Sequence, residues 1–322
     1  MRDVLGPHLI ELDGETCVVE TSMGVAIGSD LPSVSSAVEL DRYADAALAT
    51  ALQCRFKVTY ADARMRDSVV GAVDLARRLK QSADSDFFVM YQPLVRLADR
   101  HIAGYESLLR WRTQDGIVTP DRFMSVAEST SMIVPLGRRT ISQAIATLAT
   151  RISPGLGTEA FVSINLSDQQ LFDTTVTDYI GRLVAEYGVA PQQIWVEVRE
   201  NEMIQLDTPA SRTIERLHEL GCRICIDDLG SGFSALSYVR DLPIDVLKVD
   251  RSLIGRLIDN GHDRALVRAI CEVARATGIV TVAEGIEDAD VLPHLTDLGF
   301  DLGQGYFFGR PGSSPDVFGG VA

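Results

Sequence analysis

Polar and acidic side chains close a series of short β-rich runs along the last two thirds of the chain. The series is Glu106, Asn165, Glu197, Asp227 with Asp228, Lys248, Glu284 and Gln304. Taken singly, each has an ordinary structural explanation: Asn165 could cap a helix, Asp228 could shape a turn and Glu284 could be solvated. Their conjunction is more informative, because barrel enzymes assemble their sites from the ends of several strands.

These residue types predict a site for hard divalent cations. Carboxylate and amide oxygens suit Mg²⁺ or Mn²⁺, whereas zinc prefers histidine and cysteine. None of the chain's five histidines falls at these strand ends. Acids at one mouth repel each other unless more than one cation binds, and the adjacent pair Asp227 and Asp228 could bridge or divide two ions.

Two cations about 3.5 to 4 Å apart are a common device for hydrolysing a phosphodiester, because they activate water and stabilise charge in the transition state. Lys248 would then either pair with a carboxylate or orient the water and the phosphate. We favour the second interpretation.

The elements that must carry these residues alternate between strands and helices from about residue 87 onward. The strand-like segments are 87–91, 160–165, 194–198, 223–227, 246–250 and 280–284, and helical patterns lie at 136–150, 178–187, 211–220 and 263–277. This alternation predicts a parallel sheet covered by helices. Between an open sheet and a closed (β/α)₈ barrel, the polar ends of many strands favour the barrel. A second strand at 101–111 follows too soon for a helix, which predicts an antiparallel pair.

Residues 1–65 follow a different pattern. A strand at 16–27, a helix at 39–52 and an extended stretch at 55–60 make a small α+β domain or a piece of one. A helix over 66–82 then leads into the barrel. The predicted boundary therefore lies between residues 65 and 66, with the barrel unit covering 66–322.

Composition limits the partners and the location. The 322 residues are 46% hydrophobic and 23% charged, which is ordinary for a globular protein. The formal net charge of −15 argues against a nucleic-acid polymer as partner, but bound cations could still attract a small phosphate ester. We expect a cytoplasmic chain, because no apolar run is long enough for a bilayer and no signal-peptide pattern begins it.

Seven short motifs resemble the EAL-domain family in order and spacing. They are Tyr91-Gln92-Pro93, Glu106-Ser107-Leu108-Leu109-Arg110, Asn165-Leu166-Ser167, Asp227-Asp228-Leu229-Gly230-Ser231-Gly232, Leu247-Lys248-Val249-Asp250, Ala283-Glu284-Gly285-Ile286-Glu287 and Gln304-Gly305-Tyr306. The resemblance spans about residues 66–318. It implies a modified TIM-type barrel with one antiparallel strand pair, which hydrolyses cyclic di-GMP to linear 5'-pGpG with two Mg²⁺ or Mn²⁺ ions.

The resemblance also implies roles for single residues. The implied metal ligands, direct or through water, are Glu106, Asn165, Glu197, Asp227, Asp228 and Glu284. Lys248 and Gln304 would position the attacking water. Substrate contacts would come from Gln92, Leu109, Arg110 and Tyr306. Glu287 would steady the loop 228–234, which carries dimer contacts in the family. The resemblance therefore also implies a homodimer through the barrel. Asp250 has no assigned role.

The sequence departs from the family pattern at several positions. Ser107, Leu229, Ser231 and Phe233 are mild replacements. Arg199 is not, because the family usually has threonine there and period-two alternation places residues 197 and 199 on one face. Its guanidinium could pair with a ligand carboxylate, contact the substrate, or lie across the site and slow it.

The leading segment resembles the last third of a GGDEF diguanylate cyclase domain through Met23-Gly24-Val25-Ala26 and Ala44-Asp45-Ala46-Ala47-Leu48. The signature motif of that family is absent, so we expect no cyclase activity. The segment could be a remnant or the end of a longer protein.

Two alternatives to cyclic di-GMP hydrolysis remain. A receptor could bind cyclic di-GMP without hydrolysing it, although such relatives typically lose metal-binding acids or the lysine, and every expected position is filled here. A hydrolase for another phosphodiester would keep the metal site and change the base pocket.

Overall fold

The computed structural model describes residues 8–12, 15–19, 22–31, 34, 36–53, 58–62, 65, 75–129, 132–199, 208–230 and 239–313. Contacts divide the chain into two compact units, Met1–Ser82 and Ala83–Ala322. Among the described residues, no helix combines the length and the apolar character needed to cross a bilayer.

The second unit is a closed barrel, as the sequence predicts. Its strands are β5 (Phe87–Arg96), β6 (Ile102–Thr113), β8 (Phe161–Asn165), β9 (Ile194–Arg199), β10 (Arg223–Leu229), β11 (Val246–Val249), β12 (Val280–Ala283) and β13 (Leu302–Gly303). The sheet closes because β5 pairs with both β6 and β13. A short strand, β7 (Gly116–Val118), pairs with the far end of β6 outside this circle. The two-residue β13 was not among the predicted strands.

The predicted early hairpin is present, and the reversed direction of β5 affects its pairing with two neighbouring strands. β5 runs antiparallel to β6, and it also runs antiparallel to β13. In a closed barrel of otherwise parallel strands, one reversed strand must oppose both of its neighbours. The expectation of one antiparallel pair is therefore corrected to two pairings that share β5.

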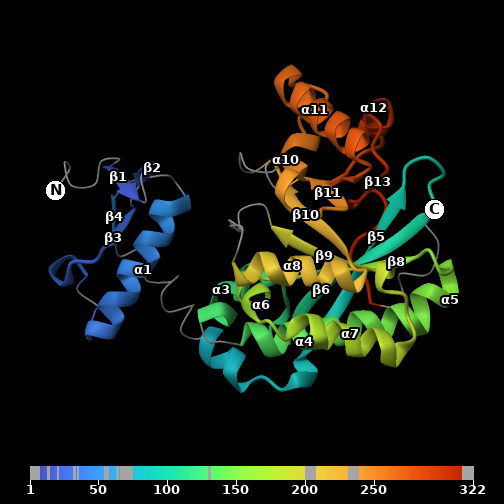
Figure 1. Cartoon of the computed structure of the whole chain (residues 1–322). Helices are drawn as coiled ribbons and strands as arrows, with labels where there is room; N and C mark the ends of the chain where they lie inside the picture. The colour runs from blue at the N-terminus through green and yellow to red at the C-terminus, as the bar shows by residue number, and fades with distance from the viewer. Residues whose placement is uncertain are drawn as a thin grey trace. The chain divides into compact units, whose positions relative to one another are not determined.

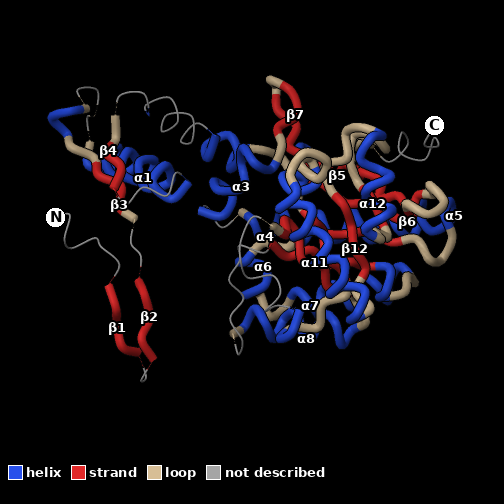
Figure 2. The backbone as a smooth tube through the Cα atoms, turned by 90° about the horizontal axis from the view of Figure 1, so that it is seen from above, coloured by secondary structure: helices blue, strands red, loops and turns tan. Residues whose placement is uncertain are grey.

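Helices cover the outside of the barrel (Figures 1 and 2). They are α3 (Pro120–Ser129), α4 (Ile133–Thr147) with the π-helical turn Leu148–Ile152, α5 (Ser153–Leu156), α6 (Asp168–Phe172), α7 (Val176–Tyr187), α8 (Pro209–Leu220), α10 (Arg251–Ile254), α11 (Gly261–Thr277) and α12 (Leu292–Leu298). Short 3₁₀ turns lie at Asp84–Asp86, Pro191–Gln193 and Ala289–Val291.

The sequence contains clear boundaries for these helices. Asn260 begins α11 by accepting hydrogen bonds from the backbone N–H groups of His262 and Asp263, and Thr208 begins α8 by accepting one from Ser211. The helices α4, α7, α8, α11 and α12 each bury an apolar stripe against the strands. The central residues of these five stripes are, in the same order, Ile141, Ile180, Ile214, Val267 and Leu295, and all are fully buried. Burial of such a side chain stabilises the fold by about 1.5 to 3 kcal/mol, so this layer holds the barrel closed.

The barrel interior begins with an apolar floor. It consists of Leu94, Phe161, Trp195, Cys225, Val246, Val282 and Leu302, one from each strand except β6. The rings of Phe161 and Trp195 stack with centroids 3.5 Å apart. On β6 the matching position is Gly104, where a Cβ atom would lie 2.6 Å from the Phe161 ring. Glycine is therefore required there by the width of the aromatic pair.

The first unit contains β1 (His8–Leu12) paired with β2 (Glu15–Val19), and a parallel pair of β3 (Met23–Val25) and β4 (Val58–Tyr60). A 3₁₀ turn lies at Gly28–Asp30, and the helix α1 (Ala37–Gln53) packs on the parallel pair. The single strand predicted over 16–27 is instead two strands with different partners. Of the predicted leading helix, 75–81 is helical and 66–74 lies outside the described residues.

The two glycines Gly104 and Gly181 give opposite predictions for the same substitution. Gly104→Ala should lower the free energy of unfolding by about 1 to 3 kcal/mol, because the new Cβ meets the Phe161 ring and backbone. Gly181→Ala, inside α7, should raise it by up to about 1 kcal/mol, because its Cβ meets only Leu220 at 3.5 Å. Urea unfolding of both variants measures the difference, and equal stabilities would contradict the tight floor.

Candidate functional site

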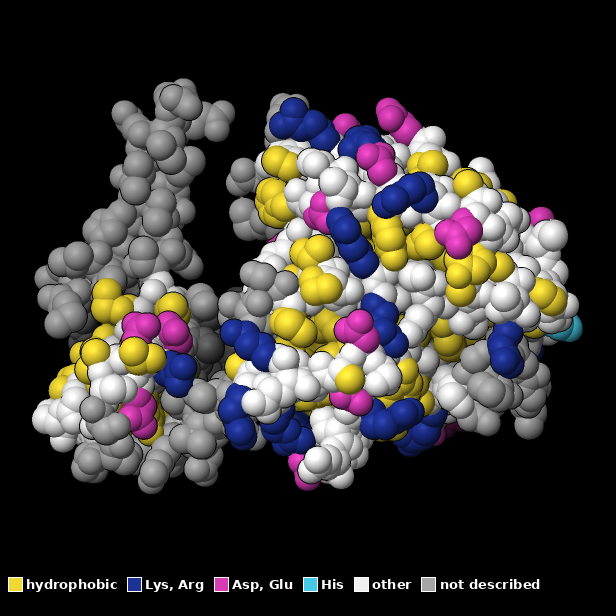
Figure 3. Space-filling model, turned by 90° about the horizontal axis from the view of Figure 1, so that it is seen from below, with side chains coloured by type: hydrophobic (Ala, Val, Ile, Leu, Met, Phe, Trp, Pro, Cys, Tyr) yellow, Lys and Arg dark blue, Asp and Glu magenta, His cyan; other side chains and the backbone are white. Residues whose placement is uncertain are grey.

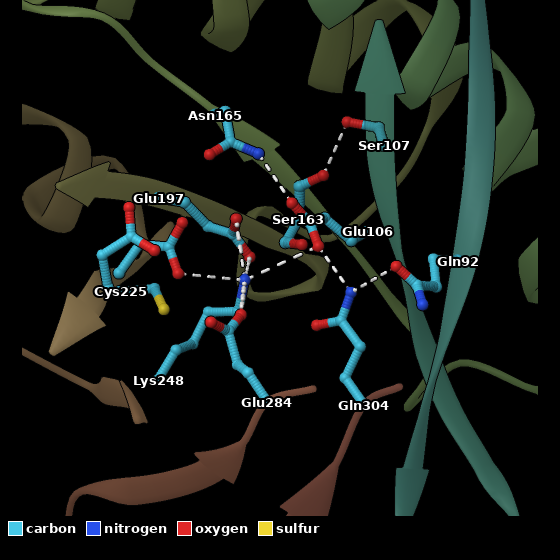
Figure 4. Close-up of polar contacts among 12 residues, drawn as sticks. Gln92, Glu106, Ser107, Ser163, Asn165, Glu197, Cys225, Lys248, Glu284 and Gln304 are labelled. Carbon is cyan, nitrogen blue, oxygen red and sulfur yellow. Dashed lines mark hydrogen bonds and ion pairs between the residues drawn. The ribbon is translucent and has the colours of Figure 1, made fainter. Parts of the chain in front are cut away.

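A layer of polar side chains stands directly on the apolar floor. Because side chains alternate along a strand, the residue two positions after each floor residue also points into the barrel. These residues are Glu106, Ser163, Glu197, Asp227, Lys248, Glu284 and Gln304. On the reversed strand β5 the same layer is reached two positions before Leu94, at Gln92. The period of the strands thus brings one polar residue from every strand to a single level (Figure 4).

The sequence pattern suggested that Glu106 ends its strand, but in the structure it does not. β6 continues to Thr113, where it pairs with β5 and β7, but it pairs with β8 only from Gly104 to Ser107. Glu106 therefore stands at the barrel mouth although it lies in the middle of a strand.

Lys248 lies at the centre of this layer (Figure 4). Its Nζ atom is 2.6 Å from Glu284 Oε1, 3.2 Å from Glu197 Oε1, 3.2 Å from Asp227 Oδ1 and 3.6 Å from Glu106 Oε2. The lysine side chain is only 1% exposed. A buried ammonium is tolerated only with compensating charge, and four carboxylates supply it here.

Amide side chains hold Glu106 from two sides. Asn165 Nδ2 donates to Glu106 Oε1 at 2.8 Å, and Gln304 Nε2 donates to Glu106 Oε2. The same Gln304 nitrogen lies 3.2 Å from Gln92 Oε1, and Gln92 Nε2 donates to the Gly309 carbonyl at 3.1 Å. These bonds set the orientation of the carboxylate, because both of its oxygens have a fixed donor.

A one-residue bulge brings Asp228 to the same mouth as Asp227. Consecutive strand residues normally point to opposite faces. Here the register between β10 and β11 slips, since Ile226 pairs with Leu247 but Leu229 pairs with Val249. Asp228 takes a left-handed conformation with φ 59°, which aspartate tolerates better than most residues. Carboxylate oxygens of Asp227, Asp228 and Glu284 consequently lie within 4.8 Å of one another.

The crowded charges shift the protonation of the layer. Burial raises the pKa of Glu284 to about 8, with Lys248 opposing and Asp227 adding to the shift. Burial and then the charge of Glu106 hold the pKa of Glu197 well above its usual range. Burial alone would lower the pKa of Lys248, but the surrounding carboxylates outweigh it and raise the pKa. Cation binding to these acids would therefore release protons.

The donor set fits divalent cations with oxygen preference. Three carboxylates already place an oxygen each around one common point, as described for Asp227, Asp228 and Glu284. Gln304 Oε1 is buried and has no hydrogen-bond donor within the described part of the chain. Carboxylate and amide oxygens are the ligands that Mg²⁺ and Mn²⁺ prefer.

Two cavities open from the layer and share Glu106 and Asp228. The first, of about 270 Å³, is also lined by Gln92, Asp250, Arg251, Glu284, Gly285, Glu287, Gln304, Gly305 and Tyr306. The second, of about 200 Å³, is also lined by Ser107, Leu108, Leu109, Pro120, Met124, Ile133, Gly137, Thr140, Asn165, Gln170, Arg199 and Asp227. The shared acids thus stand between two chambers.

Most residues that the sequence singled out come together here. Arg110 is 9% exposed, its Nη1 donates to the Leu109 carbonyl at 2.8 Å, and it lines neither cavity. Residues 231–234 of the predicted loop lie outside the described residues. Tertiary packing also brings Arg251, Thr140 and Gln170 into these walls, although no sequence pattern marks them as site residues. The capping box formed by Ser167 and Gln170 could have located the start of α6 from the sequence. It could not have shown that the Gln170 side chain lies against Gly137.

Comparisons with known proteins agree with this geometry. The EAL domain family matches residues 73–311. An uncharacterized protein of Mycobacterium tuberculosis is 33% identical over 314 residues, covering 97% of this chain and 50% of the relative. The protein named cyclic di-GMP phosphodiesterase NbdA, from Pseudomonas aeruginosa, is 31% identical and covers 94% of this chain and 39% of its own length. The chain spans about half the length of the curated relatives it matches first.

Solved structures give the same result. The structure described as PaMucR phosphodiesterase in complex with c-di-GMP has a TM-score of 0.71 and 30% identity, over 76% of this chain and 99% of that one. The EAL enzyme Bd1971, in a form bound to cAMP and cyclic di-GMP, has a TM-score of 0.74 and 30% identity, over 89% and 76% of the two chains. With its closed barrel, its inner layer of acids and this family match, the chain belongs to the EAL-domain family.

Proposed function

We propose that this protein is a cyclic di-GMP phosphodiesterase that uses two Mg²⁺ or Mn²⁺ ions to produce linear 5'-pGpG. The observation that carries the proposal is the charge of the inner layer. Four carboxylates lie within 3.6 Å of the Lys248 ammonium, and a fifth, Asp228, joins Asp227 and Glu284 at the mouth. The acids therefore carry more negative charge than Lys248 balances, and divalent cations would neutralise the excess. Burial raises the pKa of Glu197 and of Glu284, which favours the uncharged forms of these two acids when no cation is bound.

The site residues would have different roles according to their positions. Glu106, Glu197, Asp227, Asp228, Glu284 and Asn165 would hold the cations, which would activate a water and stabilise charge at phosphorus. Gln304 holds Glu106 through its nitrogen, and its unpaired oxygen could accept a hydrogen bond from the attacking water. Lys248 would fix the acids and lie near the reacting phosphate.

Several features support cyclic di-GMP as the substrate. Solved structures with bound cyclic di-GMP share the fold at 30% identity, and the relative named cyclic di-GMP phosphodiesterase NbdA is 31% identical in sequence. Two cavities adjoin Glu106 and Asp228, so a ligand could reach these acids from either cavity. On the face of the barrel unit shown in Figure 3, Lys and Arg side chains are interspersed with apolar and acidic ones, unlike the continuous basic stripe of a nucleic-acid polymer site. We also propose a homodimer through the barrel, on the basis of the family resemblance.

Product analysis tests the function. The full chain is incubated with cyclic di-GMP and Mg²⁺ or Mn²⁺, and the nucleotides are separated by chromatography. Conversion to 5'-pGpG supports the proposal, whereas binding of intact cyclic di-GMP without conversion would identify a receptor. Hydrolysis of other phosphodiesters with no preference for cyclic di-GMP would overturn the substrate assignment.

Cation dependence is the first prediction that follows from this proposed function. Turnover should require Mg²⁺ or Mn²⁺, disappear in EDTA and be weak in Ca²⁺, because the larger Ca²⁺ ion accepts looser coordination and longer ligand distances. Initial rates at matched ionic strength measure this. Equal turnover in Ca²⁺ or EDTA would contradict the two-metal proposal.

The second prediction concerns Glu106. Glu106→Gln keeps the shape of the side chain but removes one cation-holding charge, so kcat should fall by at least about a hundredfold. Thermal unfolding should change little. Glu159→Gln is the matched control: it makes the same change on an exposed residue before β8, at the opposite end of the barrel, and should retain full activity.

Lys248→Met provides a third prediction, on stability. Removing the ammonium leaves four carboxylates facing one another, which should lower the stability of the metal-free protein by about 3 to 5 kcal/mol. Mg²⁺ should restore part of this loss, so the rise in Tm with Mg²⁺ should be larger for the variant than for the wild type. Lys80→Met, an exposed lysine, serves as the control. A Tm equal to that of the wild type in EDTA would show that Lys248 does not neutralise the layer.

A further inference from the structure

Arg199 stands at the rim of the proposed site in direct register with a carboxylate. Its Cα atom is paired with that of Asp227 across β9 and β10, and its side chain lines the second cavity with Asn165 and Asp228. The nearest approach between its guanidinium and an acid is 3.8 Å, from Nε to Asp228 Oδ2. The side chains are 61% and 40% exposed. The acid beside Arg199 is therefore Asp228, and Glu197 instead pairs with Lys248.

The five acids of the site are thus divided between two cationic side chains, Lys248 and Arg199. Lys248 lies within 3.6 Å of Glu106, Glu197, Asp227 and Glu284 and is fully buried. Asp228 is not one of these partners and instead faces Arg199 at the solvent edge. The bulge in β10 is what makes this second pair possible, because a regular strand would point Asp228 away from the barrel interior.

We infer that Arg199 is a positioning residue that competes with a divalent cation for Asp228 and thereby selectively weakens the cation site to which Asp228 contributes. This inference rests on the proposed two-metal function and names a regulation of the same site. Within the described residues, Arg199 makes no ion pair with the acids that surround Lys248, so cation binding that depends on those acids alone is not affected. The protein would then bind its two cations with clearly different affinities.

The geometry indicates the size of the effect. A separation of 3.8 Å exceeds a hydrogen bond, and solvent reaches both partners, so the interaction is a screened attraction between charges. Two unit charges at about 4 Å interact by roughly 1 kcal/mol in water. We therefore expect a three- to tenfold change in the affinity of one site. Because both groups are exposed, the change should shrink as salt is added.

Binding of Mn²⁺ to the full chain without nucleotide tests the inference. Electron paramagnetic resonance counts free Mn²⁺ and resolves two classes of site per chain. Arg199→Gln removes the charge and should lower the Kd of the weaker class three- to tenfold, with less effect at high salt. Arg199→Lys keeps the charge and should bind as the wild type does. The matched control is Arg216→Gln, which loses an arginine that pairs with Asp178 at 2.8 Å, and it should also leave both classes unchanged.

Three results would overturn the inference. Identical Mn²⁺ isotherms for wild type and Arg199→Gln would show no competition. Equal tightening in Arg199→Gln and Arg199→Lys would assign the effect to bulk instead of charge. Unchanged Mn²⁺ binding with kcat/KM for cyclic di-GMP reduced about tenfold or more would make Arg199 a substrate contact. In each of these cases, wild-type hydrolysis leaves the proposed function standing, whereas a wild type that binds no Mn²⁺ and hydrolyses nothing would end both.

Discussion

The buried ammonium of Lys248 and its four carboxylate partners impose the main constraint on this barrel. Charges removed from water are stable only if opposite charge stays close. The apolar floor below and the closed sheet around the layer leave the mouth as the route by which solvent or ions can reach it. The same closure that buries these charges therefore prepares a site that attracts cations from one side.

Two irregularities in an otherwise regular parallel barrel shape this site. The reversed strand β5 contributes Gln92 to the layer from the opposite direction, and Gln92 joins Gln304 and Glu106 in one hydrogen-bonded group. The bulge in β10 adds Asp228 to a face that already holds Asp227. The bulge costs regular pairing locally and adds one polar group where an ideal barrel would have none.

The outer edge of the site differs in character from its centre. Lys248 is enclosed and three of its four partners lie 2.6 to 3.2 Å from its Nζ atom, while Arg199 and Asp228 are exposed and 3.8 Å apart. A buried pair changes little with salt, but an exposed pair weakens as ions screen it. Lys248 is therefore a structural counter-charge, whereas the strength of the Arg199–Asp228 pair depends on salt. Arg199 occupies the position where this chain departs from the usual family pattern.

Local sequence was sufficient for much of this arrangement. The alternation of strands and helices, the early hairpin and the polar residues at the mouth all follow from short-range periodicity, and the structure confirms the barrel that they predict. The functional roles of the individual site residues stay predictions. Only the tertiary structure revealed the two-residue β13, the middle-of-strand position of Glu106 and the hydrogen bond from Arg110 to the Leu109 carbonyl. It also selected Asp228 as the partner of Arg199 and placed Gln170 in a cavity wall. These features depend on closing the barrel and on a one-residue slip between strands, and neither is encoded in a local pattern, because contacts between distant segments exist only once all the strands have paired.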